Sequence, residues 1–179
     1  MRISIVLALV AACSGGSSPK AKSNLRDCFA YTMPAGWREE PSQTGADVVL
    51  MGTTEFPAGG TTMRDNFVVR YLPWIGSLDS FKATLLSAVK QQNVEKPAIE
   101  PVEPVVTPTT LGGRAAFEVD VKNTLTLDSG TIPMTNVTVF AKFGDELVSI
   151  AAGYVDSREA EVKPLQTAFL ASIRFDRCK

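Results

Sequence analysis

The side chains that most often carry chemistry are scarce in this sequence of 179 residues. It contains no histidine, which is the commonest general base and the commonest protein ligand for zinc and copper. Serine–histidine, cysteine–histidine and HExxH mechanisms are therefore excluded. The chemistry that remains is that of paired carboxylates, of a serine–lysine pair, or of calcium or magnesium held by oxygen ligands.

Two patterns could supply that chemistry, and neither is specific. The SSPK sequence at positions 17–20 has the SxxK spacing of penicillin-binding enzymes, but its partner motifs are missing. Glu118 and Asp120 project from one face of a predicted strand, where a solvated sheet face is favoured over a catalytic pair. We therefore predict that the protein is not an enzyme and has no catalytic residue, metal site or cofactor. A carboxylate- or calcium-dependent enzyme is the second alternative.

The first residues have the order of a secretory signal. Met1 and Arg2 precede an apolar stretch, Ile3 to Ala12, which is too short to span a bilayer as a helix. The sequence LVAAC at positions 9–13 resembles the lipobox of bacterial lipoproteins, in which the cysteine sulfur takes diacylglycerol. The alternative is an ordinary N-terminus that packs into a core. We predict a signal peptide at 1–12, lipidation of Cys13, and anchoring in the bacterial envelope; Ser14 favours the periplasmic face of the outer membrane.

The residues after Cys13 divide into a tether and one domain. Positions 13–24 are rich in glycine and serine, which predicts a flexible tether. Positions 25–179 are long enough for one domain with its own core. Cys28 and Cys178 lie near its two ends, and in an oxidising compartment we expect them to form a disulfide. Closing that loop of roughly 150 residues restricts the unfolded chain by on the order of 4 to 5 kcal/mol.

Hydrophobic periodicity predicts the elements of this domain. Strands are expected near 28–32, 46–52 and 66–72, followed by a helix with Ser77 as its N-cap. The apolar stripe of that helix is Leu78, Phe81, Leu85, Leu86 and Val89. Four prolines between Pro97 and Pro108 indicate an extended connection or an edge.

The C-terminal half predicts an antiparallel meander and a last helix. Three strands are expected in the meander, at 115–121, 137–143 and 147–155, from apolar residues at alternate positions and the turns between them. Asp156 and Glu159 have the spacing of a capping box that opens the helix, whose predicted stripe is Val162, Leu165, Phe169 and Ile173. Pro164 predicts a kink or a later start. The fold class is therefore α+β, with an antiparallel sheet and two main helices.

Three short segments resemble PsbP-like domains: Met33-Pro34-Ala35-Gly36-Trp37 after the first strand, Gly112-Gly113-Arg114-Ala115 before the meander, and Ile173-Arg174-Phe175 at the end. PsbP-like proteins include photosystem accessory subunits, a binder of a small GTPase, secretion chaperones and many bacterial lipoproteins. The resemblance implies a binding or assembly role without catalysis, although a fold alone does not fix a function.

The predicted function is that of a membrane-anchored, non-catalytic module that binds an unknown envelope protein. The charge is nearly balanced, with 18 basic against 19 acidic residues, and no run of lysine or arginine forms a basic stripe, so we predict no nucleic-acid partner. The candidate partner-binding residues are Trp74 and Ile75, in a loop marked by Pro73 and Gly76. Trp74 could instead be a lid on the core. The first alternative function is a periplasmic carrier of a lipid or small apolar ligand.

Overall fold

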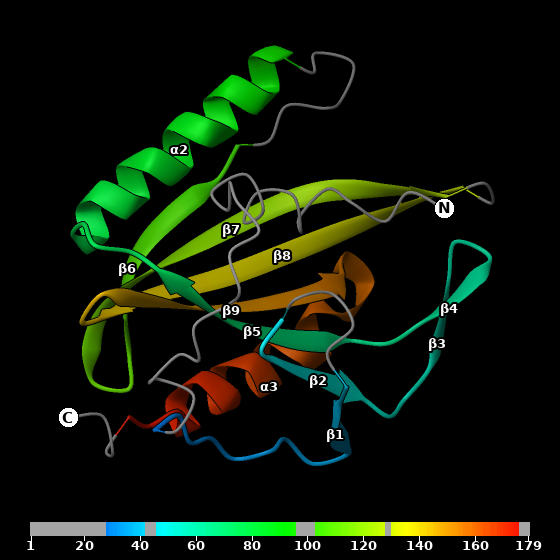
Figure 1. Ribbon diagram of the computed structural model, residues 1–179. Coiled ribbons are helices and arrows are strands. Elements are labelled where there is room, and N and C mark those ends of the chain that lie inside the picture. The colour runs from blue at the N-terminus through cyan, green and yellow to red at the C-terminus, as the bar shows by residue number, and fades with distance from the viewer. Residues whose placement is uncertain (1–27, 42–45, 96–102, 128–129, 176–179) are drawn as a thin grey trace.

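The computed structural model describes residues 28–41, 46–95, 103–127 and 130–175. Its centre is a seven-stranded sheet in which every neighbouring pair of strands is antiparallel (Figure 1). In spatial order the strands are β1 (Trp37–Glu40), β2 (Val48–Gly52), β5 (Asn66–Pro73), β9 (Glu146–Val155), β8 (Gly130–Phe143), β7 (Arg114–Leu127) and β6 (Val105–Leu111). The meander β7–β8–β9 is confirmed.

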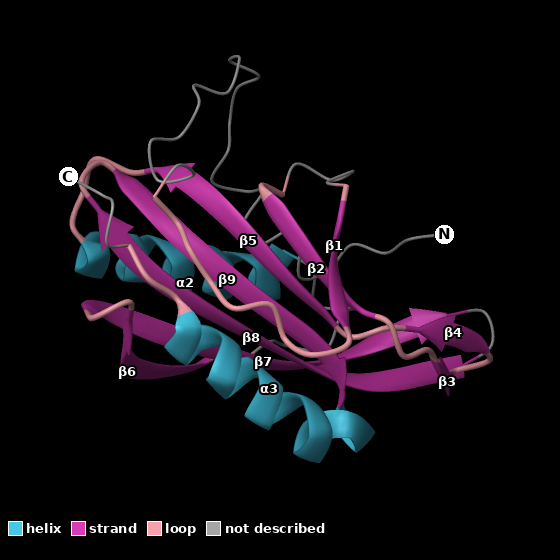
Figure 2. Cartoon of the chain, turned by 90° about the horizontal axis from the view of Figure 1, so that it is seen from below, coloured by secondary structure: helices cyan, strands magenta, loops and turns pink. Residues whose placement is uncertain are grey.

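The two helices cover opposite faces of the sheet, as Figure 2 shows. They are α2 (Leu78–Glu95) and α3 (Glu159–Ser172), and a short 3-10 turn, η2 (Asp156–Arg158), precedes α3. A separate hairpin, β3 (Phe56–Ala58) with β4 (Thr61–Met63), extends from the side. The predicted α+β class, an antiparallel sheet with two main helices, is therefore confirmed.

Each helix covers its own apolar cluster. Beneath α2, the side chains of Phe81, Leu85 and Val89 pack on Phe117 and Phe140 of the sheet. Beneath α3, the ring of Phe169 stacks on Phe67 with centroids 4.9 Å apart, and Phe67 stacks on Trp37 at 4.3 Å. The central strands are thus covered on both faces, and the large aromatic rings hold the helices to the sheet.

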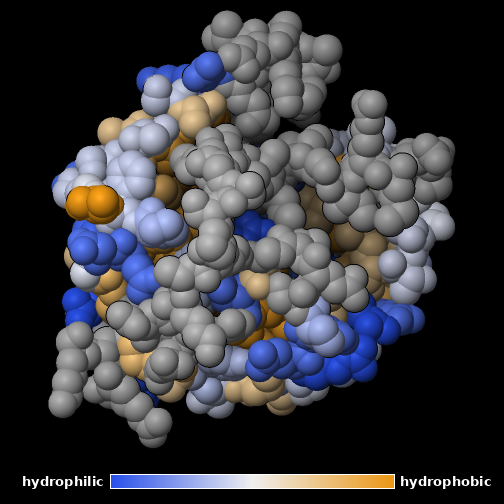
Figure 3. Space-filling model, in the orientation of Figure 1, coloured by the Kyte–Doolittle hydropathy of each residue, from blue (hydrophilic) through white to orange (hydrophobic). Residues whose placement is uncertain are grey.

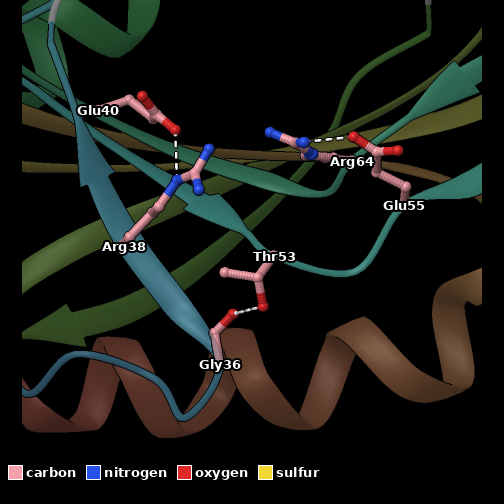
Figure 4. A network of polar contacts seen from close by, with 6 residues as sticks. All are labelled: Gly36, Arg38, Glu40, Thr53, Glu55 and Arg64. Atoms are coloured by element: carbon pink, nitrogen blue, oxygen red, sulfur yellow. Dashed lines mark hydrogen bonds and ion pairs between the residues drawn. The ribbon is translucent and has the colours of Figure 1, made fainter.

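The Pro-x-Gly-Trp segment forms the turn that brings Trp37 into this stack. Gly36 has a φ of 74°, a conformation that costs glycine little, and the Trp37 amide donates to the Pro34 carbonyl at 3.1 Å. The Gly36 carbonyl accepts hydrogen bonds from the Thr53 amide at 2.9 Å and from the Thr53 hydroxyl at 2.6 Å (Figure 4). The structural role that the resemblance implied for this segment agrees with these contacts.

The start of α2 follows the prediction. The Ser80 amide donates to the Ser77 hydroxyl oxygen at 3.0 Å, so Ser77 caps the helix. Of the predicted stripe, Phe81, Leu85 and Val89 are buried, and Leu78 packs against the same cluster.

The start of α3 differs from the prediction. The capping box is wrong: α3 begins at Glu159 after a 3-10 turn, and no side chain caps it. Asp156 instead accepts a hydrogen bond from the Thr135 hydroxyl at 2.8 Å. Pro164 lies inside the helix, which starts later than the capping box implied. Val162, Phe169 and Ile173 of the predicted stripe are buried, whereas Leu165 is exposed and Gln166 is buried in its place. The buried face of α3 therefore passes through position 166, which is four residues from Val162 and three from Phe169.

Of the two extended segments, the first differs from the prediction, and the described part of the second agrees with the predicted edge. Residues 28–32 do not form a strand but a single bridge, in which the Ala30 and Arg174 amides donate to each other's carbonyls at 3.0 and 2.9 Å. Val105 onward forms the edge strand β6, while residues 97–102 lie outside the described part.

Pro108 lies on the open side of this edge strand. The turn between β6 and β7 is Gly112-Gly113, with φ of 55° and 77°, which is the two-residue hairpin turn with two positive φ values. Such a turn makes Leu111 and Arg114 a hydrogen-bonded pair. Hydrogen-bonded and non-hydrogen-bonded positions then alternate along β6, and Pro108, three residues before Leu111, is at a non-hydrogen-bonded position. The backbone groups of Pro108 therefore point away from β7. Proline has no N–H to donate there, which protects the edge against pairing with another chain.

Candidate partner-binding surface

The loop that holds Trp74 is fixed to the turn between β8 and β9. The Trp74 amide donates to the Asp145 carbonyl at 2.7 Å. The Trp74 carbonyl accepts a hydrogen bond from Lys142 Nζ at 2.8 Å, and the same ammonium group donates to the Gly144 carbonyl. The two bonds to Trp74 join residues about 70 positions apart in the sequence, so the loop is held by the sheet.

The Trp74 side chain fixes the loop from the inside. Its ring packs edge-on against Phe81 with centroids 5.1 Å apart, and its indole Nε1 donates to the Ser77 carbonyl at 3.0 Å. A Cβ added to Gly76 would lie 2.5 Å from Ser80 Oγ and 2.8 Å from Trp74 Nε1. Neither distance is a possible contact, so the loop closes tightly over the start of α2.

Ile75 belongs to the same fixed loop, and its apolar side chain faces solvent. Its side chain is 91% exposed, against 63% for Val105 and 36% for Leu165, which are also exposed large apolar residues in the described chain. Figure 3 shows a strongly hydrophobic spot among hydrophilic residues near the start of α2. An apolar side chain on a preorganised loop loses little conformational entropy on binding, which suits a contact with a partner.

The structure therefore separates the two residues that the sequence grouped together. Trp74 is half-buried and packs against the cluster under α2, whereas Ile75 faces solvent. Core lid and binding anchor were alternative interpretations of Trp74. In the structure, Trp74 has the environment of a lid, and its neighbour Ile75 has the exposure that an anchor needs. Partner binding by this loop stays a prediction.

Several loops and both described chain ends meet at this end of the sheet. Phe175 packs on Phe143, at the end of β8, with ring centroids 3.9 Å apart. A Cβ on Gly112 would lie 2.5 Å from Phe175 Cδ2. Arg174 pairs with Ala30, next to Cys28 in sequence. We call this the loop end: the 73–77 loop, the 112–113 and 144–145 turns, Ala30, and residues 174–175.

The three cysteines are only partly described. Cys28 is buried at the loop end, while Cys13 and Cys178 lie outside the described residues. The bridge between Ala30 and Arg174 brings the chain near Cys28 beside the chain that leads to Cys178. This proximity favours the predicted disulfide, which stays a prediction.

The carboxylates Glu118 and Asp120 are half-buried on the α3 side of β7, where the sequence favoured a solvated face. Burial raises the pKa of both carboxyls; Asp120 raises the pKa of Glu118 further, and Lys163 opposes the rise in both. Asp120 Oδ1 is buried without a hydrogen-bond partner. Burial and the nearby carboxylates raise the pKa of Tyr154 to about 12.

This acidic patch was only partly visible in the sequence. The alternation of β7 placed Glu118 and Asp120 on one face, but Glu159 and Lys163 of α3 join them only through the tertiary fold. An open groove of about 870 Å³, lined in the described chain by η2 and α3 alone, shares Glu159 and Lys163 with this patch. Its lining is Asp156, Ser157, Glu159, Ala160, Lys163, Pro164, Thr167, Ala168 and Ala171.

The described residues contain no group of three or more histidine, cysteine, aspartate or glutamate side chains placed to hold a metal ion. Within the same residues, no helix has the length and apolar character needed to cross a membrane.

Comparison of the structure with solved structures identifies the fold. The cyanobacterial PsbP of Synechocystis sp. PCC 6803 matches with a TM-score of 0.56 at 15% sequence identity, covering 90% of this chain and 97% of that one. The fold is PsbP-like. This chain also matches Mycobacterium tuberculosis LpqN, a protein involved in cell envelope biogenesis, with a TM-score of 0.53 at 12% sequence identity over 82% of each chain.

A third match extends the PsbP-like fold beyond bacteria. The Saccharomyces cerevisiae Ran-binding protein Mog1p matches with a TM-score of 0.54 at 12% identity, covering 83% of this chain and 90% of that one. No protein-family model and no curated protein matches the sequence. At these identities the likeness shows the fold alone.

The supports of the loop were missed by sequence reasoning. Lys142 and Asp145 fix the Trp74 backbone, yet the sequence shows them only as a polar strand residue and a turn residue. Pro73 and Gly76 marked the loop correctly, but the partners that make it rigid lie on β8 and in the β8–β9 turn.

Proposed function

We propose that the protein is a lipid-anchored, non-catalytic module of the bacterial cell envelope that binds a protein partner through the Ile75 loop. Cys13 carries the lipid in this proposal, and the PsbP-like domain is the binding unit. The observation that carries the binding role is the exposed Ile75 side chain on a loop fixed by Lys142, Asp145 and Ser77.

A fixed loop distinguishes a binding anchor from an incidental exposed residue. Scattered apolar side chains on a protein surface are ordinary. The residue before Ile75, Trp74, is however held at its backbone by hydrogen bonds with Lys142 and Asp145 at the end of β8, and its half-buried ring packs on Phe81. Such preorganisation reduces the entropy lost on association. The structural likeness to LpqN, which is involved in cell envelope biogenesis, supports an envelope role.

The lipid-carrier alternative has less support. A carrier encloses most of its ligand in a concave, largely apolar pocket. In the described residues, the groove along α3 is open to solvent and has Asp156, Glu159 and Lys163 in its lining. Both faces of the sheet beneath the helices are filled by aromatic and aliphatic side chains.

The binding role is tested by changing Ile75 alone. Ile75→Asp in the lipidated protein should abolish co-purification of the partner from membranes without lowering thermal stability, because the side chain makes little contact with the domain. Val105→Asp is the matched control, since Val105 is an exposed apolar residue on β6. An unchanged set of partners with Ile75→Asp, or equal loss with both variants, argues against the role.

The anchor is tested separately from the loop. Labelled fatty acid should enter the unaltered protein but not a Cys13→Ala variant, because the lipid is attached to the cysteine sulfur. Equal labelling of the two proteins would show that Cys13 is not the site.

A further inference from the structure

The Ile75 loop lies at the same end of the domain as the start of the chain that leads to Cys13. Contacts link the two step by step: Ala30 pairs with Arg174, Phe175 packs on Phe143, and Asp145 holds the Trp74 backbone. Figure 1 shows the start of α2, the β6–β7 turn and the β8–β9 turn on one side of the molecule. The segment from Cys13 therefore joins the domain at the loop end.

The length of that segment limits how far the loop end lies from a membrane. About 15 residues separate Cys13 from Cys28, and a flexible chain of that length has a root-mean-square span of about 20 Å. A lipid on Cys13 would thus keep the loop end close to the bilayer. It would also raise the effective concentration of the loop toward anything fixed in the same membrane.

The opposite end of the domain carries the β3–β4 hairpin. Phe56 of β3 lies beneath the Arg158 guanidinium, 4.4 Å from the ring centroid, at the start of α3. The 14 residues of α3 span about 20 Å, and the chain just after α3 pairs with Ala30 at the loop end. Thr62 of β4 is exposed on this far end.

The residues around Ile75 favour a protein over the lipid itself. Ile75 is a single exposed large apolar side chain, and the two charged residues that hold its loop are the exposed Asp145 and the half-buried Lys142. The Lys142 ammonium group is engaged by the Trp74 and Gly144 carbonyls, and the carboxylate of Asp145 is a charge of opposite sign, so the loop carries no excess of positive charge. Binding to a lipid surface depends on a larger apolar area together with positive charge. One apolar residue on a rigid loop is better suited to a pocket on a protein.

We infer that the partner of the Ile75 loop is a protein fixed in the same membrane, with its binding surface within about 20 Å of the bilayer. This inference rests on the proposed lipid anchor and on the proposed binding role of the loop. Beyond the proposed function, the inference specifies what kind of molecule the partner is and how far its binding surface lies from the bilayer. A freely diffusing protein or a lipid headgroup as the ligand of the loop would contradict it.

The test uses a photo-crosslinking amino acid, benzoylphenylalanine, at position 75 of the full-length lipidated protein in the cells that make it. Position 62 on the far end is the matched control. Each version is made with its own tether and with 30 Gly/Ser residues inserted after Ser18. The insertion triples the chain between Cys13 and the domain, so the layer above the bilayer that the loop samples thickens by a factor of about 1.7, and the effective concentration toward a partner in the same membrane falls by the same factor.

The expected result is a protein adduct at position 75 whose yield falls by a factor of about 1.7 with the long tether, and no such adduct at position 62. An adduct whose yield is unchanged or increased by the long tether overturns the inference, while the binding role stands. An adduct with lipid overturns the choice of a protein. No adduct at position 75 with either tether, in a protein shown to carry labelled fatty acid, contradicts the proposed binding role itself.

Discussion

The ion pair between Asp65 and Arg158 gives a quantitative test of the structure. Asp65 Oδ2 accepts hydrogen bonds from Arg158 Nη2 at 2.9 Å and Nε at 3.1 Å, and the Asp65 side chain is 7% exposed. The Arg158 guanidinium also lies over the ring of Phe56. Arg158→Met keeps most of the apolar contact but leaves a buried carboxylate without its cation. Breaking such a pair by removing one partner costs about 3 to 5 kcal/mol.

The double variant Asp65→Asn, Arg158→Met distinguishes lost charge compensation from lost packing. With no buried charge left, it should regain about half or more of the stability that Arg158→Met loses. The measurement is urea unfolding of the purified unaltered, single-variant and double-variant proteins at pH 7. For a domain of this size the single change should also lower Tm by about 10 °C. A loss below about 1 kcal/mol with Arg158→Met, or a double variant no more stable than that single variant, would refute the reasoning.

Two further predictions concern the sheet. Burial raises the pKa of Glu118 and Asp120 above their ordinary values of 4.5 and 3.8, so each carboxyl favours the folded state when protonated and opposes it when ionised. Glu118→Gln with Asp120→Asn should therefore raise Tm at pH 7, and the gain should vanish as the pH falls below those ordinary values; a gain that is independent of pH contradicts the assignment. Pro108→Thr restores an outward N–H on β6, so we expect concentration-dependent self-association in analytical ultracentrifugation. A strictly monomeric Pro108→Thr variant would show that Pro108 does not protect this edge.

The parts of the fold that were predictable are those with long, regular patterns. Strands β7 to β9 run for ten residues or more, which gives alternation enough positions to be recognised. The α2 stripe and its Ser77 cap are local in sequence and follow from side-chain spacing and cap chemistry. Their prediction requires no knowledge of the rest of the chain.

The missed elements are short or depend on tertiary contacts. β1 has the sequence WREE and β4 has TTM, and neither shows an apolar alternation. The start of α3 failed because Asp156 is engaged by Thr135 on β8, a contact that competes with capping. The same limit applies to the candidate site, since Lys142 and Asp145 act on Trp74 through space.

The bridge between Ala30 and Arg174 has a consequence for how the domain can be rearranged. Ends that lie side by side can be joined by a short linker without stretching the fold, and a new opening can then be made in an exposed turn. The Gly59-Gly60 turn of the β3–β4 hairpin is such a place, far from the sheet centre. A circular permutant opened there should keep its core, and it would carry a lipid on the opposite side of the molecule from Ile75.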